Sequence, residues 1–272
     1  MMKTDPTKTL TLRNRTSRTI DARFNRVKRA VRSAFNVGGL VTNTRMAQDG
    51  EFEFLSSREK IPAFESFLQE QIDSEILRLS PLTPQEIAFE NHWLTSSVSE
   101  GYRRGAVKSR LAAERNIPQL NALPDFNPFA NPNHVERGEI IFRQVYSDLV
   151  GVTEAMSKQM SRTLAQGIIQ GATPRKVAAN MSARIDKIGK TRAKLIARTE
   201  IIHAHNLAAI QEASNLSAET GVEIKMEWNA SLDDRVRHTH EERHGKLFDA
   251  QAVIPLLGEP NCRCSVIPSF DV

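Results

Sequence analysis

Apolar residues recur at three- and four-residue spacing along most of this chain, the pattern of helices that bury one face. The spacing starts near Ser17, and Gly38-Gly39 predicts where the first helix ends. A second helix is expected from Pro62, because proline fits a first helical turn. A third is expected from Thr83, a residue type that caps helices, to about Arg115. The polar residues before Ser17 have no period, and we expect them to be disordered.

Longer helices are predicted in the second half of the chain. A stripe of Ile, Val, Leu and Met runs through residues 135–170 at helical spacing. Gly171 suits a C-terminal cap, and Thr173-Pro174 suits the start of the following helix. That helix is expected to end near Gly189, and another to span about 190–217.

Strand-like alternation is confined to short segments. Residues 51–55 and 222–228 alternate apolar and polar positions, as strands with one buried face do. Two further short strands are expected closer to the C-terminus, at GKLF and CSVIP. The predicted fold class is therefore α+β and predominantly helical. A helical N-terminal half precedes long C-terminal helices that pack on a small antiparallel sheet.

The chain divides most clearly at residues 116–134, which hold four prolines and five asparagines. This composition is typical of a linker. We predict a basic arm and helix, a helical region, the linker and a C-terminal domain, over residues 1–36, 37–115, 116–134 and 135–272. Because apolar residues interrupt the prolines, the linker could instead be an ordered arm that lies on a neighbour.

The composition is that of an ordinary globular protein, with 40% hydrophobic and 25% charged residues in 272. No apolar run approaches the roughly 20 residues of a membrane-spanning helix, and we expect no secretory signal at the N-terminus. The two cysteines are separated by one residue, too close for an unstrained disulfide. Disulfide-rich secreted, transmembrane and collagen-like classes are thereby excluded.

Positive charge is concentrated at the N-terminal end. Residues 1–36 carry ten basic and two acidic groups, so the remaining chain has a net charge of −3 within a total of +5. Such an arm favours an anionic polymer, and we expect sequence-independent contacts with double-stranded DNA. A solvated tail is the alternative. The candidate nucleic-acid-binding residues are Arg13, Arg15, Arg18, Arg23, Arg26, Lys28, Arg29 and Arg32.

An ordered set of polar and aromatic residues stands near the C-terminus. It begins with Arg198-Thr199-Glu200 on a predicted helix and continues with Trp228 at the end of a predicted strand. The rest of the set comprises Asp234, Arg235, His240, Gly245, Pro260, Cys262 and Cys264. In this order the residues resemble the phage Mu F-like minor head protein family, also called phage head morphogenesis proteins. The resemblance covers about residues 160–270.

The resemblance implies a low-copy virion protein rather than an enzyme. Proteins of this family associate with the portal and the procapsid interior during assembly in the host cytoplasm. They act in head assembly, and some in DNA packaging or delivery. The expected partners are a portal protein, capsid or scaffold proteins and double-stranded DNA, with no membrane. An acidic portal surface is an alternative partner for the basic arm.

The charged residues of the set have a structural and a catalytic interpretation. In the structural one, Glu200 pairs with Arg235 or Arg237 and fixes how the helix meets the following hairpin. Arg198 would pair in the same way with one of the aspartates at 233 and 234. In the catalytic alternative, the protein is an RNase-like nuclease. His240 is then the general base, Glu200 its partner and Arg235 a phosphate clamp.

The histidines and cysteines could form a metal site. If the chain is extended, His238 and His240 share one face, and so do Cys262 and Cys264. Two thiolates and two imidazoles suit a closed, tetrahedral structural zinc site. The alternative is a pair of half-buried thiols with free histidines. We expect no cofactor, with structural zinc as the open alternative.

Overall fold

The computed structural model describes residues 5–36, 41, 44–46, 52–54, 57–81, 91–118, 120 and 125–270. The chain forms two compact units, and each unit is assembled from separate segments. The first unit comprises Met1–Thr16, Pro81–Tyr146 and Leu195–Val272. The second comprises Ser17–Ser80 and Ser147–Lys194. The predicted linker, residues 116–134, falls within the first unit.

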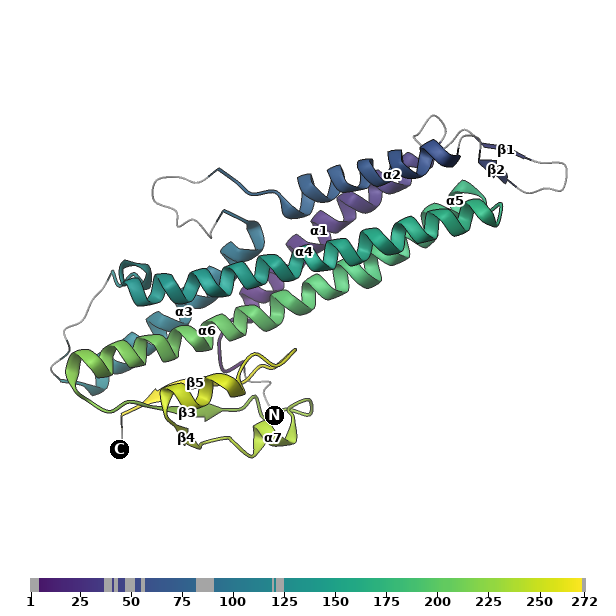
Figure 1. Cartoon of the computed structure of the whole chain (residues 1–272). Coiled ribbons are helices and arrows are strands. Elements are labelled where there is room, and N and C mark those ends of the chain that lie inside the picture. The colour runs from purple at the N-terminus through teal and green to yellow at the C-terminus, as the bar shows by residue number, and fades with distance from the viewer. Residues whose placement is uncertain are drawn as a thin grey trace. The chain divides into compact units, whose positions relative to one another are not determined.

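The predicted α+β class is confirmed, because helices dominate and the strands are short (Figure 1). The α-helices are α1 Leu10–Ala34, α2 Ser57–Ile72, α3 Trp93–Asn116, α4 Pro132–Ile169, α5 Pro174–Arg184, α6 Thr191–Thr220, α7 His238–Glu241 and α8 Ala250–Val253. Two π-helical segments are η1 Asp73–Leu77 and η3 Ile185–Lys190, and two 3-10 turns are η2 Pro128–Ala130 and η4 Ile254–Leu256. The strands are β1 Thr44–Met46, β2 Phe52–Phe54, β3 Lys225–Asn229, β4 Leu247–Phe248 and β5 Ser265–Ser269.

Helix α1 begins earlier than the sequence predicts. The expected start at Ser17, with disorder before it, is wrong from residue 5 onward, since α1 begins at Leu10. The Asp5 carboxylate accepts a hydrogen bond from the Leu10 amide at 2.6 Å and pairs with Arg13 at 3.1 Å. An acidic side chain thus satisfies a backbone N–H group at the start of α1. Such a cap does not change the apolar periodicity, so the periodicity could not predict it.

The starts of the next two helices also differ from the prediction. Because α2 begins at Ser57, Pro62 lies inside the helix rather than in its first turn. The predicted cap Thr83 lies outside the described residues. Helix α3 begins at Trp93, where the ring of His92 accepts a hydrogen bond from the Leu94 amide at 3.2 Å.

The junctions after α4 are partly as predicted. Gly171 has a φ of 57°, and the Thr173 hydroxyl accepts a hydrogen bond from the Lys176 amide at 3.2 Å, which confirms the cap and the helix start. The predicted break at Gly189 is wrong, since η3 joins α5 to α6. A Cβ at Gly189 would lie 2.5 Å from the Phe24 ring, so this glycine permits close packing and does not form a turn.

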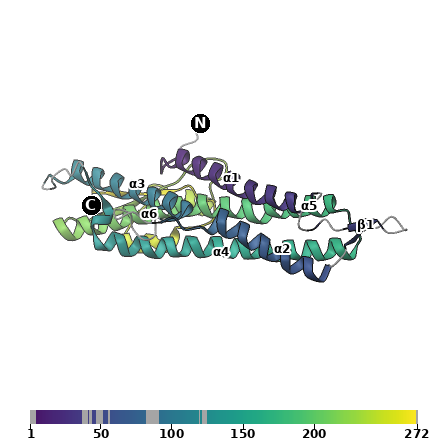
Figure 2. The same ribbon diagram turned by 90° about the horizontal axis from the view of Figure 1, so that it is seen from above.

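Within the first unit, α3 and α6 run parallel in close contact (Figure 2). Gly101 lies against Ile201, and the Ser109 hydroxyl donates to the carbonyl of Ala209 at 3.0 Å. A Cβ at Gly105 would lie only 2.0 Å from the carbonyl oxygen of His205. Small residues at four-residue spacing therefore bring the two backbones together.

The predicted C-terminal strands are confirmed and form one antiparallel sheet in the order β4-β3-β5. Trp228 of β3 lies opposite Val266 of β5. The buried face of the sheet packs with Ile210 and Ala213 of α6 and with Ile117 after α3. This core fixes the sheet against α6, as Figure 1 shows.

Candidate functional site

The residues of the ordered C-terminal set meet where the start of β5 lies against α6. The Thr199 hydroxyl accepts a hydrogen bond from the Asn261 amide at 3.1 Å. The Asn206 side chain donates to the carbonyl of Cys264 at 3.1 Å and accepts from the amide of Val266 at 3.2 Å. Helix α6 therefore holds this segment through a hydroxyl and an amide that bond to the backbone.

The predicted charge pair between α6 and the hairpin is wrong. The Glu200 carboxylate lies 3.4 Å from the ring of His203, one turn further along the same helix, and does not pair with Arg235 or Arg237. Arg198 is exposed on α6. The Glu200 carboxylate thus has its partner on its own helix, while Thr199 and Asn206 bond to the segment that leads into β5.

The hairpin charges pair instead with the loop before β5. Asp233 binds the Arg263 guanidinium through both oxygens, and this pair lowers the pKa of Asp233 to about 2. Arg237 pairs with Glu259 at 3.1 Å and donates to the Pro260 carbonyl at 2.9 Å. These charge-assisted bonds connect the two C-terminal loops. Asp234 and Arg235 are exposed.

His240 lies buried between a carboxylate and two sulfurs. Its side chain is 1% exposed. Its Nδ1 atom is 3.4 Å from Sγ of Cys262 and 3.6 Å from Sγ of Cys264. Its Nε2 atom is 3.1 Å from a carboxylate oxygen of Glu259. Since a carboxylate only accepts hydrogen bonds, Nε2 carries the proton and the Nδ1 lone pair faces the sulfurs in the neutral ring.

His238 lies apart from this cluster. The predicted extended conformation is wrong here, because residues 238–241 form the short helix α7. Side chains two positions apart on a helix point to different sides. The His238 side chain is 83% exposed and lies 3.2 Å from the Glu242 carboxylate. Of the four predicted metal ligands, the structure brings together His240 and the two cysteines.

The pKa values of the two thiols shift in opposite directions. A hydrogen bond from Cys262 is the main cause that lowers the pKa of Cys264. The same hydrogen bond in turn raises the pKa of Cys262. Cys264 is buried and Cys262 is partly exposed. Both sulfurs lie close to Nδ1 of His240.

Trp228 packs against the cluster of His240, Cys262 and Cys264. Its side chain is fully buried, and its ring meets the His240 ring edge to face at 5.2 Å between centroids. Arg243 lies over the indole at 5.2 Å. Gly245 has a φ of 75° and donates its amide hydrogen to the Trp228 carbonyl at 2.9 Å, which closes the turn into β4. Trp228 and Gly245 thus position His240.

Several of the candidate nucleic-acid-binding residues have partners inside the protein. Arg13 is buried and pairs with Asp5. Arg23 and Arg26 both bind Glu75. The predicted basic arm is thus part of a packed helix, whose charges fasten it to distant segments.

The remaining candidate residues differ in exposure. Lys28 pairs with Asp186 and is partly buried. Arg15, Arg18, Arg29 and Arg32 are classed as exposed. The Arg32 guanidinium also donates to the Ser182 hydroxyl at 3.0 Å.

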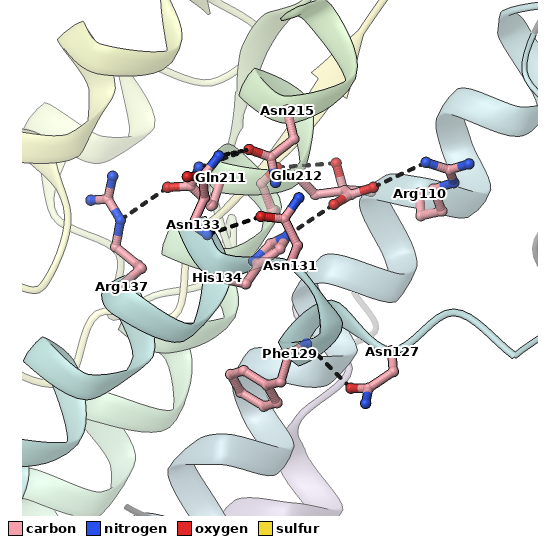
Figure 3. A network of polar contacts seen from close by, with 12 residues as sticks. Arg110, Asn127, Phe129, Asn131, Asn133, His134, Arg137, Gln211, Glu212 and Asn215 are labelled. Carbon is pink, nitrogen blue, oxygen red and sulfur yellow. Dashed lines mark hydrogen bonds and ion pairs between the residues drawn. The ribbon is translucent and has the colours of Figure 1, made fainter. Parts of the chain in front are cut away.

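A second buried polar cluster carried no sequence signal (Figure 3). His134 is fully buried, with Nδ1 2.9 Å from the Tyr102 hydroxyl and Nε2 2.9 Å from the Glu212 carboxylate. Glu212 also lies 3.6 Å from Arg110, which pairs with Glu114 at 3.1 Å. This network ties α3, α4 and α6 together within the first unit.

The segment that carries the ordered C-terminal set is similar to a known protein family. Residues 158–267 match the family model described as phage Mu protein F like protein. This match confirms the resemblance over those residues. The match contains α6, β3, β4, the start of β5 and the His240 cluster.

Two curated relatives match longer stretches. An uncharacterized protein of Haemophilus influenzae is 30% identical over 185 residues, which are 64% of this chain and 39% of that protein. NAD(+)--arginine ADP-ribosyltransferase EFV of Enterococcus faecalis is 24% identical over 132 residues, 43% of this chain and 27% of that protein. The chain spans less than half the length of these relatives. No solved structure matches.

Among the described residues, no helix combines the length and the apolar character that a bilayer crossing requires.

Proposed function

We propose that this protein is a phage minor head protein that is held in the capsid interior near the portal. It acts in head assembly and in DNA packaging or delivery, with the portal and capsid or scaffold proteins as partners. The observation that supports this proposal is the Mu F-like match over residues 158–267. The match covers the segments that build the C-terminal site. The residues that resemble the family are therefore the residues that form this site.

One face of α1 is the proposed contact with double-stranded DNA. Arg18, Arg29 and Arg32 are exposed on α1. At about 100° per residue, they project within roughly 60° of one another. Three phosphate contacts would give a slope of about −3 for log affinity against log salt. The contact is sequence-independent, because the described chain carries no DNA-reading motif.

No observation favours the nuclease alternative. A general base needs a ring nitrogen that can reach a substrate. The two ring nitrogens of His240 face Glu259 and the cysteine sulfurs, while Glu200 contacts His203. The ADP-ribosyltransferase activity belongs by name to a relative of which the match covers 27%. We therefore propose a role in assembly and not in catalysis.

Mass spectrometry of purified virions tests the proposal. We expect the protein at low copy number inside DNA-filled heads, and defective heads when its gene is deleted. Absence from virions together with normal head formation would contradict the proposal.

Charge variants test the contact with DNA. Replacing Arg18, Arg29 and Arg32 together by Ala should flatten the salt slope. The control Arg143→Ala, at a side chain 83% exposed, should leave the slope unchanged. If the triple variant keeps its DNA affinity but no longer enters procapsids, this face contacts the portal instead.

A further inference from the structure

Three soft or borderline ligand atoms converge in the C-terminal unit. The donor atoms of His240, Cys262 and Cys264 all lie within 4.8 Å of one another. They come from α7 and from the loop that leads into β5, so the fold brings together residues about 20 positions apart. An ion at their centre needs only small adjustments, because zinc–sulfur and zinc–nitrogen bonds are about 2.3 and 2.0 Å long.

Glu259 holds the histidine in the orientation that a metal ligand needs. Metal-binding histidines usually donate their other ring N–H to a carboxylate or a carbonyl, which fixes the tautomer. Glu259 accepts from Nε2 of His240 at 3.1 Å, and the Nδ1 lone pair faces the two sulfurs. Arg237 pairs with the same carboxylate at 3.1 Å and fixes it in turn.

From this arrangement we propose that His240, Cys262 and Cys264 bind one zinc ion, with Glu259 as the positioning residue. Two thiolates and an imidazole form a donor set that suits zinc, whereas magnesium and calcium prefer oxygen ligands. The charges also balance, because Zn²⁺ with two thiolates and a neutral imidazole has no net charge. A neutral centre can be buried against Trp228 at little electrostatic cost.

The site differs from the closed Cys₂His₂ site that the sequence suggested. His238 is exposed on the other side of α7, so three protein ligands remain and solvent takes the fourth position. Cys262 is the less buried of the two cysteine ligands. The ion would connect α7 to the start of β5, which Thr199 and Asn206 already hold on α6.

Cobalt substitution tests the site on the whole chain. Protein stripped of metal under reducing conditions is titrated with Co²⁺, whose tetrahedral thiolate complexes absorb in the visible and the near ultraviolet. We expect saturation at one Co²⁺ per chain and loss of the bands when Zn²⁺ is added. Cys262→Ser, Cys264→Ser and His240→Ala should abolish the bands. Glu259→Gln should weaken binding 10- to 100-fold.

His238→Ala is the matched control, since it removes a histidine of the same helix turn that lies away from the sulfurs. It should bind cobalt like the unaltered protein. Unaltered protein that gives no thiolate bands, or a His238→Ala variant that loses them as His240→Ala does, would overturn the proposal. Should the buried variants fail to fold, the unaltered protein still decides, because bound zinc must protect both thiols from an alkylating reagent. This test is independent of the role in phage heads.

Discussion

Two histidines of the first unit, His134 and His240, are almost equally buried, with 0% and 1% of the side chain exposed. His134 has oxygen partners on both ring nitrogens, the hydroxyl of Tyr102 and the carboxylate of Glu212. The second nitrogen of His240 faces sulfur instead. Burial therefore does not distinguish a structural histidine from a candidate metal ligand. The difference lies in the partner of the second ring nitrogen, which is an oxygen atom for His134, whereas that nitrogen faces sulfur in His240.

His205 is a third case. It is 1% exposed, and neither of its ring nitrogens has a hydrogen-bond partner. It lies where α3 and α6 approach most closely, against Gly105. The three histidines thus represent a satisfied network, a candidate metal ligand and an unsatisfied buried group, and each environment has a different experimental signature.

The largest expected loss comes from breaking the His134 network. Glu212→Ala removes the shared partner of His134 and of Arg110, whose side chain is 8% exposed. Arg110 keeps Glu114, but the buried ring of His134 loses its carboxylate partner, which costs about 3 kcal/mol of unfolding free energy. The control Glu219→Ala removes a carboxylate that is 61% exposed and 3.8 Å from the same guanidinium. Its cost should be under about 1 kcal/mol.

Urea denaturation of both variants measures this difference. Equal losses from Glu212→Ala and Glu219→Ala would mean that the network does not hold the three helices together.

His205 should make stability depend on pH. Burial lowers the pKa of His205 to about 4, against 6.5 in the unfolded chain. The folded state favours the neutral ring, so its contribution is complete above pH 6.5. That contribution falls as the pH drops from 6.5 to 4, by about 3 kcal/mol in total. In His205→Leu this part of the pH dependence should be absent.

Unfolding free energies of both proteins between pH 7 and pH 4 give the difference, in which the titration of the carboxylates cancels. Identical pH profiles would contradict the account of His205 as an unpaired, neutral buried group.

Breaking the contact between α6 and the loop before β5 should cost less unfolding free energy than the two changes above. Thr199→Val keeps the shape and removes the acceptor of the Asn261 amide, so about 1 kcal/mol should be lost. Asn206→Ala removes two hydrogen bonds of the same segment and should cost more. Thermal unfolding ranks the two variants, and a larger loss in Thr199→Val would show that these hydrogen bonds do not set the position of the loop.

Much of the helix and strand pattern could be predicted from periodicity, because the long helices and β3 each bury one regular face. The stripe of α4 from Ile141 to Leu164 is buried as predicted. The start of α1 could not be predicted in the same way, because it depends on a carboxylate five residues upstream. Apolar periodicity predicts which face of a helix is buried, but it does not predict the residues that cap the helix.

The candidate site was predicted in composition but not in pairing. Trp228, His240 and the two cysteines do lie together, although His240 comes from α7 and the cysteines from the loop before β5. The charge partners were wrong because they depend on the path of the loop before β5. Gly258 and Asn261 have φ values of 83° and 60° in that loop, a conformation that no hydrophobic pattern reveals.

The network of His134 was missed for a related reason. Its histidine ends the segment 116–134, whose prolines and asparagines predict a linker, and its partners are 32 and 78 residues away. Asparagines of that segment instead cap helical turns, as Asn127 does for Phe129 in Figure 3. A segment rich in proline and asparagine can thus form ordered turns between helices as well as a linker.

The most direct test of the zinc site is X-ray absorption at the zinc edge, measured on the unaltered protein loaded with one equivalent of Zn²⁺. The account predicts two sulfur neighbours at about 2.3 Å, with one imidazole nitrogen and one further light atom at about 2.0–2.1 Å. A coordination shell of nitrogen and oxygen atoms alone would contradict the account. It would mean that the sulfurs of Cys262 and Cys264 do not bind the ion, so that their position beside His240 would not set this histidine apart from His134.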